Sequence, residues 1–165
     1  MKTTFIMNKI IPWRRNANFY ADCLNNMQEL HDDVAKTIEG LPLEALDWSP
    51  KAGVNSITVL IVHLTGSQKF LFGEVIGGQD VHRDRDAEFL AKGLKPDQLT
   101  QRLNDSLKYI ESVLEGLTLA DLERKCMFCT REVTVGWAIG HSLKHTATHL
   151  GHIQVIRDLW EQFKA

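Results

Sequence analysis

Cysteine is scarce in this chain, with 3 residues among 165, and long apolar runs are missing. Three cysteines do not make a disulfide framework, and an odd count in a helical chain favours a reducing cytoplasm. The early apolar patch at residues 5–7 is too short for the core of a signal peptide. No stretch approaches the roughly 20 apolar residues of a transmembrane helix. We therefore predict a cytoplasmic protein with no membrane partner.

An excess of basic residues is also missing. The chain has 19 lysines and arginines against 21 acidic residues, which gives a formal net charge of -2. The short basic pairs at 14–15 and 83–85 are too small and too balanced to form the basic patch that nucleic acid requires. We therefore expect no nucleic-acid partner.

Apolar residues recur at helical spacing in four long segments. They predict helices over about residues 12–39, 56–76, 96–114 and 134–163, with Ser56 and Thr134 as capping residues. We expect a small hairpin between Cys126 and Val133, and at most a short irregular helix in the polar stretch 79–92. The chain has no internal repeat and no low-complexity linker. It is therefore predicted to be an all-α four-helix bundle, with a hairpin segment before the last helix, in a single domain over residues 1–165.

The last predicted helix carries a row of four histidines on one face. His141, His145 and His149 are spaced by four residues, and His152 follows three residues later. At about 100° per residue, the four side chains fall within an arc of roughly 80°. Neutral imidazole is the commonest metal ligand in proteins, and two histidines one turn apart can bind the same ion. The row therefore indicates a metal site.

The spacing of these histidines along the helix axis limits which of them can bind the same ion. His141 and His149 are separated by about 12 Å along the axis, which is too far for one metal. Three pairs therefore remain open: His141 with His145, His145 with His149, and His149 with His152.

A third ligand is expected from another helix, and His63 is the best candidate. It lies inside the apolar run 59–64, where an unpaired polar group would be costly. On a helical wheel His63 shares a face with Glu74. His31 and His82 lie among polar residues and are expected to be solvated.

Other reactive side chains are assigned supporting roles. Glu74, His141 and His152 are candidates for proton transfer or for support of the metal ligands. Cys126 and Cys129 form a single C-x-x-C motif. Because no second such motif and no βαβ pattern accompany it, we interpret the two as ordinary cysteines near a hairpin.

Two short motifs stand at the starts of the second and fourth predicted helices. The first comprises Leu46–Pro50, Asn55–Ile57 and His63, and reads as W-x-P, S-I and H-L. The second comprises Thr134–Gly136 and the segment 141–151, and is similar to an H-x3-H-x-G pattern. In order and spacing these motifs resemble the DinB-like superfamily of metal-binding four-helix bundles, across nearly the whole chain.

The resemblance implies that His63, His145 and His149 are the metal ligands, which selects one of the three open pairs. Leu150 and His152 stand where the family often has Arg and Gln, so the substrate stays open. A three-histidine site with an open position suits a divalent ion, Zn first and then Ni, Fe or Mn.

Relatives include bacillithiol S-transferases, mycothiol-dependent isomerases and proteins similar to metal-dependent hydrolases. The resemblance therefore implies a metal-dependent enzyme that acts on a small-molecule substrate, with a low-molecular-weight thiol as cosubstrate. The alternatives are a metal-dependent hydrolase and a non-catalytic metal-binding bundle with a stress-related role. Family members often form dimers, so we expect a homodimer.

Overall fold

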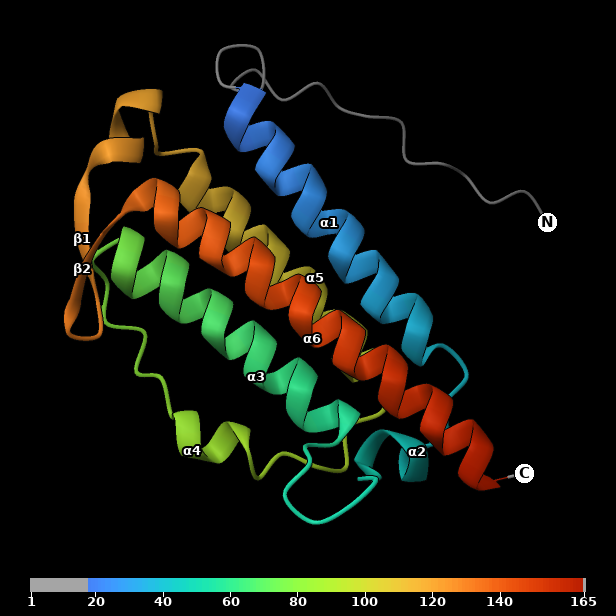
Figure 1. The fold of residues 1–165 in the computed structure, drawn as a ribbon. Helices are drawn as coiled ribbons and strands as arrows, with labels where there is room; N and C mark the ends of the chain where they lie inside the picture. Colours follow the sequence, from blue (N-terminus) through green and yellow to red (C-terminus); the bar gives the residue numbers. More distant parts are fainter. Residues whose placement is uncertain (1–17, 165) are drawn as a thin grey trace, which may run out of the picture.

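The computed structural model describes residues 18–164, and long helices packed side by side dominate it (Figure 1). The long elements are α1 (Asn18–Ile38), α3 (Ile57–Lys69) with its π-helical continuation η2 (Phe70–Ile76), α5 (Pro96–Leu114) and α6 (Val135–Lys164). The short elements are α2 (Leu43–Asp47), α4 (Arg85–Glu88), the 3-10 turn η3 (Leu119–Glu123), β1 (Lys125–Phe128) and β2 (Arg131–Thr134). The two strands pair antiparallel. The predicted all-α bundle with a hairpin before the last helix is confirmed.

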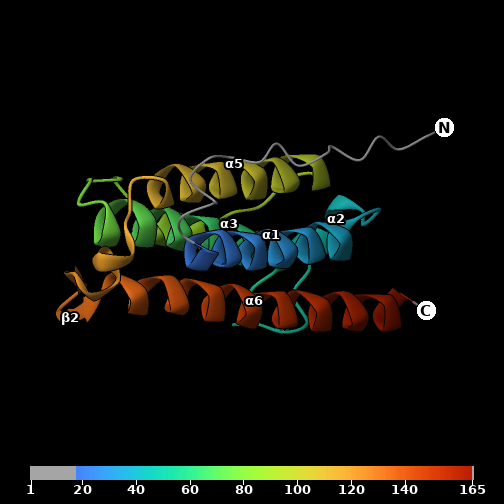
Figure 2. The same ribbon diagram turned by 90° about the horizontal axis from the view of Figure 1, so that it is seen from above.

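Helices α3 and α5 run in one direction through the bundle, and α1 and α6 run in the other (Figure 1). Both α1 and α3 pack against α5 and against α6, and α5 and α6 lie on opposite sides of the bundle (Figure 2). Because α3 and α5 are parallel, the connector 77–95 must return along α3 before α5 can begin. This crossover brings α4 against α3.

The predicted capping residues begin their helices. The Ser56 hydroxyl accepts a hydrogen bond from the Val59 N–H at 3.3 Å, and the Thr134 hydroxyl accepts one from the Trp137 N–H at 3.1 Å. The second long helix changes to π-helical hydrogen bonding at Phe70, which apolar periodicity does not reveal. The predicted start of the first helix near residue 12 lies outside the described residues, as do residues 5–7 and 14–15.

The prediction that no stretch approaches the length and hydropathy of a membrane span was wrong for the segment Ile57–Ile76. Its most apolar window is 78% buried within the bundle. This is the position of a core helix, and it explains why the segment is so rich in apolar residues.

His31 is buried, so the prediction that it is solvated was wrong. The side chain is 2% exposed and lies in the bundle core. Its Nδ1 donates to the Leu103 carbonyl at 3.1 Å, and its Nε2 accepts from the Gln68 amide at 2.8 Å. The acidic neighbours Asp32 and Asp33 are exposed. Adjacent helix positions point about 100° apart, so polar neighbours in sequence say little about the burial of a helical residue.

Candidate metal centre

Three histidines from two facing helices converge between α3 and α6. His63 lies on α3, and His145 and His149 lie one turn apart on α6. One ring nitrogen of each lies within 4.8 Å of those of the other two. The His63 ring centroid is 5.3 Å from that of His145 and 5.2 Å from that of His149. The structure therefore brings together the three residues predicted as ligands, in a cluster that could hold a metal ion.

The distance between two of the donor atoms fits a shared ion. Nε2 of His145 and Nε2 of His149 lie 3.1 Å apart. Two nitrogens at about 2.0–2.1 Å from one zinc ion are separated by about 3.3 Å in tetrahedral geometry. Neighbouring ligands of an octahedral ion lie slightly closer together. The observed separation falls within this range without any movement of the helices.

Burial keeps the imidazoles in the form that binds metals. Desolvation, with a contribution from neighbouring histidines, lowers the pKa of His145 to about 3 and that of His149 to about 4. The pKa of His63 is also lowered, mainly by burial and against the opposing effect of Glu88. All three rings are therefore neutral at pH 7, and each has a lone pair that needs no proton removed before it can bind a cation.

Two members of the cluster, His63 and His145, lie in the wall of a pocket of about 420 Å³. The pocket is lined by His63, Ser67, Phe70, Glu74, Arg83, Arg85, Phe128, Cys129, His141 and His145. Glu74 and His141, two of the candidates for proton transfer, thus lie in the same pocket as His63 and His145. His152 does not line this pocket, although its ring centroid is 5.7 Å from that of His149. It lines a separate groove whose other residues include Val155 and Leu159.

The His141 side chain is held by aromatic neighbours. Its ring stacks on Trp137, with centroids 4.7 Å apart and an interplanar angle of 14°, and it lies 5.3 Å from the ring of Phe128. Burial lowers the pKa of His141, with a smaller contribution from Lys144. The ring is therefore neutral at pH 7 and able to accept a proton.

The hairpin carries both cysteines of the C-x-x-C motif. The Cys126 thiol lies 3.7 Å from the Val133 carbonyl, and burial raises its pKa. Cys129 is exposed, occupies the hairpin turn with a φ of 55°, and lines the pocket. Over residues 18–164, neither cysteine belongs to a group of side chains arranged to hold a metal.

Sequence reasoning missed Glu88 and Arg83 as parts of this site. Glu88 Oε2 lies 2.9 Å from Nδ1 of His63, and the Arg83 guanidinium contacts both carboxylate oxygens. No periodic pattern marks them, because they lie in the polar crossover. Only the return path of the chain along α3 brings them to the histidines.

The fold and the site define a class of protein, a four-helix bundle with a three-histidine cluster between two of its helices. A family model described as the DinB superfamily matches residues 26–153. The chain belongs to the DinB superfamily. No curated protein matches it.

A solved structure has the same fold. It is described as a conserved protein of locus from Enterococcus faecalis, and it matches with a TM-score of 0.68 at 13% identity. The match covers 86% of this chain and 96% of that one.

Proposed function

We propose that the protein is a metal-dependent enzyme that transfers a low-molecular-weight thiol to a small electrophilic substrate. The observation that carries the proposal is the convergence of three neutral imidazoles, two of which line a pocket large enough for a small molecule. Three protein ligands leave a coordination position open on a divalent ion. When bound, such an ion supplies positive charge that favours the thiolate form of a thiol.

The residues of the pocket have separate tasks in this reaction. His63, His145 and His149 would hold the ion. His141 accepts the thiol proton, because its ring is neutral and is held in place by Trp137. The sulfur then forms a bond to the electrophilic carbon, and the leaving group departs with its electron pair.

Other pocket residues suit the recognition of a substrate. Phe70 and Phe128 offer an apolar surface, with ring centroids 6.0 Å apart. The exposed Arg85, whose guanidinium lies 4.9 Å from the Phe89 ring centroid, offers a positive charge at the same pocket. We therefore expect the electrophile or the thiol to carry an anionic group.

The test is a screen of metal-loaded protein. Samples loaded with Zn, Ni, Fe or Mn are mixed with bacillithiol, mycothiol or glutathione and a chromogenic aryl halide. We expect thioether formation with at least one thiol, and loss of that activity in a His145→Ala variant. A Cys129→Ser variant is the matched control, because it alters the pocket wall outside the histidine cluster.

The alternative reaction is metal-dependent hydrolysis, and the position of Glu74 favours it. This carboxylate lines the pocket, and a glutamate side chain can act as the general base in hydrolysis. Turnover of nitrophenyl esters or amides without any thiol would favour this alternative. Failure of both screens would favour a non-catalytic metal-binding bundle.

Two further expectations stay predictions. A homodimer is supported by the apolar side chains exposed on α6, where Val155 is 57% and Phe163 is 70% exposed. Light scattering on the purified protein tests the oligomeric state. A cytoplasmic location is supported by the free thiols of Cys23, Cys126 and Cys129.

A further inference from the structure

The crossover between α3 and α5 places a buried carboxylate against the histidine cluster. Helix α4 is only four residues long, and the Asp84 side chain caps it by accepting from the Ala87 N–H at 3.0 Å. The side chains of Arg85 and Asp86 are exposed, whereas Glu88 is only 7% exposed. Burial of a carboxylate is costly unless the group is paired. The groups that pair with Glu88 therefore indicate the role of this buried carboxylate.

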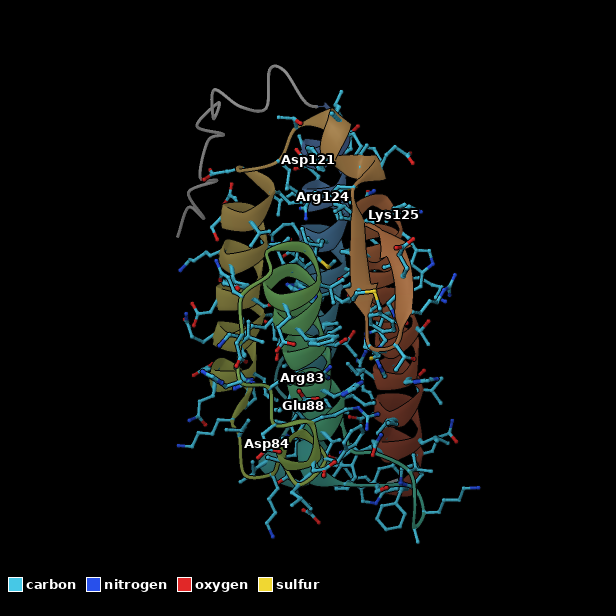
Figure 3. All side chains as sticks on the ribbon, turned by 90° about the vertical axis from the view of Figure 1, so that its left-hand side faces the viewer. Arg83, Asp84, Glu88, Asp121, Arg124 and Lys125 are labelled. Atoms are coloured by element: carbon cyan, nitrogen blue, oxygen red, sulfur yellow. The ribbon has the colours of Figure 1, made fainter. Side chains whose placement is uncertain are left out.

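Both oxygens of Glu88 have partners. Arg83 donates from Nε to Oε1 at 2.7 Å and from Nη2 to Oε2 at 2.8 Å. Nδ1 of His63 lies 2.9 Å from Oε2. Figure 3 shows Arg83 and Glu88 close together where the connector passes α3. Because the guanidinium holds the carboxylate by two parallel hydrogen bonds, the orientation of the group is fixed and one oxygen faces His63.

Gly66 makes room for this carboxylate on α3. It follows His63 by three residues, so the two lie on the same face of the helix. A Cβ atom at position 66 would lie 2.1 Å from Oε1 of Glu88 and 2.7 Å from its Cδ. Glycine inside a helix is destabilising relative to alanine. The close approach of Glu88 supplies a physical reason for glycine at this position.

We infer that Glu88 is a positioning residue of the metal centre. It holds His63 in the tautomer that donates Nδ1–H to the carboxylate, so the Nε2 lone pair is free to bind an ion. Metal-binding imidazoles commonly donate their other N–H to such a group, which fixes the ring and raises the basicity of the ligand nitrogen. The inference rests on the proposed metal site.

The other two histidines differ from His63 in this respect. Across residues 18–164, neither His145 nor His149 has a carboxylate hydrogen-bond partner, and Nδ1 of His149 is buried without any partner. Glu88 lies outside the group of described side chains that could hold an ion, which contains only the three histidines. The protein therefore orients the cluster through His63.

Two variants remove the effect of Glu88 in different ways. Glu88→Ala deletes the carboxylate, whereas Gly66→Ala keeps it and displaces it with a methyl group. Gly140→Ala is the matched control, because it adds the same methyl group to α6 at a position with nothing within 4 Å. Glu88→Gln keeps an oxygen that can accept the Nδ1–H of His63, and serves as the conservative variant.

The variants are compared by zinc affinity and by the tautomer of His63. Competition with a chromophoric chelator measures the affinity, and we expect it to fall about 10–100-fold in Glu88→Ala and Gly66→Ala. Gly140→Ala should match the wild type, and Glu88→Gln should retain most of the affinity. Long-range ¹⁵N–¹H NMR of zinc-free protein should show the Nδ1–H tautomer of His63 in the wild type and a mixture of tautomers in the two disruptive variants.

The outcomes separate this inference from the proposed function. Wild-type protein that binds zinc no more tightly than Glu88→Ala and Gly66→Ala overturns the inference alone, and Glu88 then only anchors the crossover. An unchanged His63 tautomer in both variants overturns it as well. Wild-type protein that binds no divalent metal overturns the proposed function and the inference together. Should Glu88→Ala fail to fold, Gly66→Ala carries the same test.

Discussion

Nε2 of His145 and Nε2 of His149 lie 3.1 Å apart, and the two residues are separated by one turn of α6. Two neutral imidazoles at this distance either share a hydrogen bond or present two lone pairs to one cation. His63 closes the group from the facing helix. The site thus depends on two elements that are distant in sequence, and its predicted properties follow from that arrangement.

Metal content should depend on the cluster and not on the other histidines. We expect His63→Ala, His145→Ala and His149→Ala each to lose bound zinc, because two imidazoles hold an ion much more weakly than three. His152→Ala should keep it, since His152 lines a different groove. Elemental analysis of protein purified without a histidine tag measures the content. Retention of stoichiometric metal in His145→Ala would place the site elsewhere.

Bound metal should stabilise the folded protein. An ion that binds only the folded state adds about 2.7 kcal/mol at a free concentration of 100 times its Kd. For a chain of this size that corresponds to a rise in Tm of roughly 5–10 °C. Calorimetry with zinc and then with excess chelator measures the shift, and His145→Ala should show none. An equal shift in the variant would indicate zinc binding outside the cluster.

His141 should contribute to the rate of the proposed transfer and not to metal binding. Loss of a general base typically costs about 10²–10⁴ in rate, so we expect His141→Asn to lower kcat by that order at unchanged metal content. Because the His141 ring stacks on Trp137, we expect its replacement to change the rate and to leave the histidine cluster in place. Steady-state kinetics with saturating thiol measures it, with Cys129→Ser as the control. A wild-type kcat in His141→Asn would remove this residue from the mechanism.

Acid should destabilise the bundle through His31. Burial lowers the pKa of this side chain from 6.5 to about 4, against the opposing effects of its hydrogen bonds to Leu103 and Gln68. Between these two pH values the unfolded chain binds the proton more readily than the folded protein does, so stability falls as the pH drops. Over the whole range, the free energy of unfolding should fall by about 3 kcal/mol.

Denaturant unfolding from pH 7 to pH 4 tests this prediction. The stability of the wild type relative to His31→Gln should fall over this range, because the variant lacks the titrating group. His82→Gln is the control, since the His82 side chain is 86% exposed. The prediction would be contradicted if the difference in unfolding free energy between the wild type and His31→Gln did not change with pH.

Much of the fold could be predicted because it depends on local signals. The helix Pro96–Leu114 begins and ends where a first-turn proline and the apolar period placed it. Ser56 and Thr134 cap their helices because a hydroxyl just before an apolar run meets free backbone N–H groups. The π-helical turn at Phe70 and the burial of His31 escaped prediction, since both are decided by packing between helices.

By itself, the sequence determined the helices, the hairpin and the row of histidines, because helical spacing sets which side chains share a face. It left three histidine pairs open, and only the approach of α3 to α6 shows His63 beside His145 and His149. The tertiary structure also separated His141 from His152 by turning them toward different cavities. It alone brought in Glu88, because two parallel helices require a crossover, and the path of that crossover depends on the packing of the whole bundle.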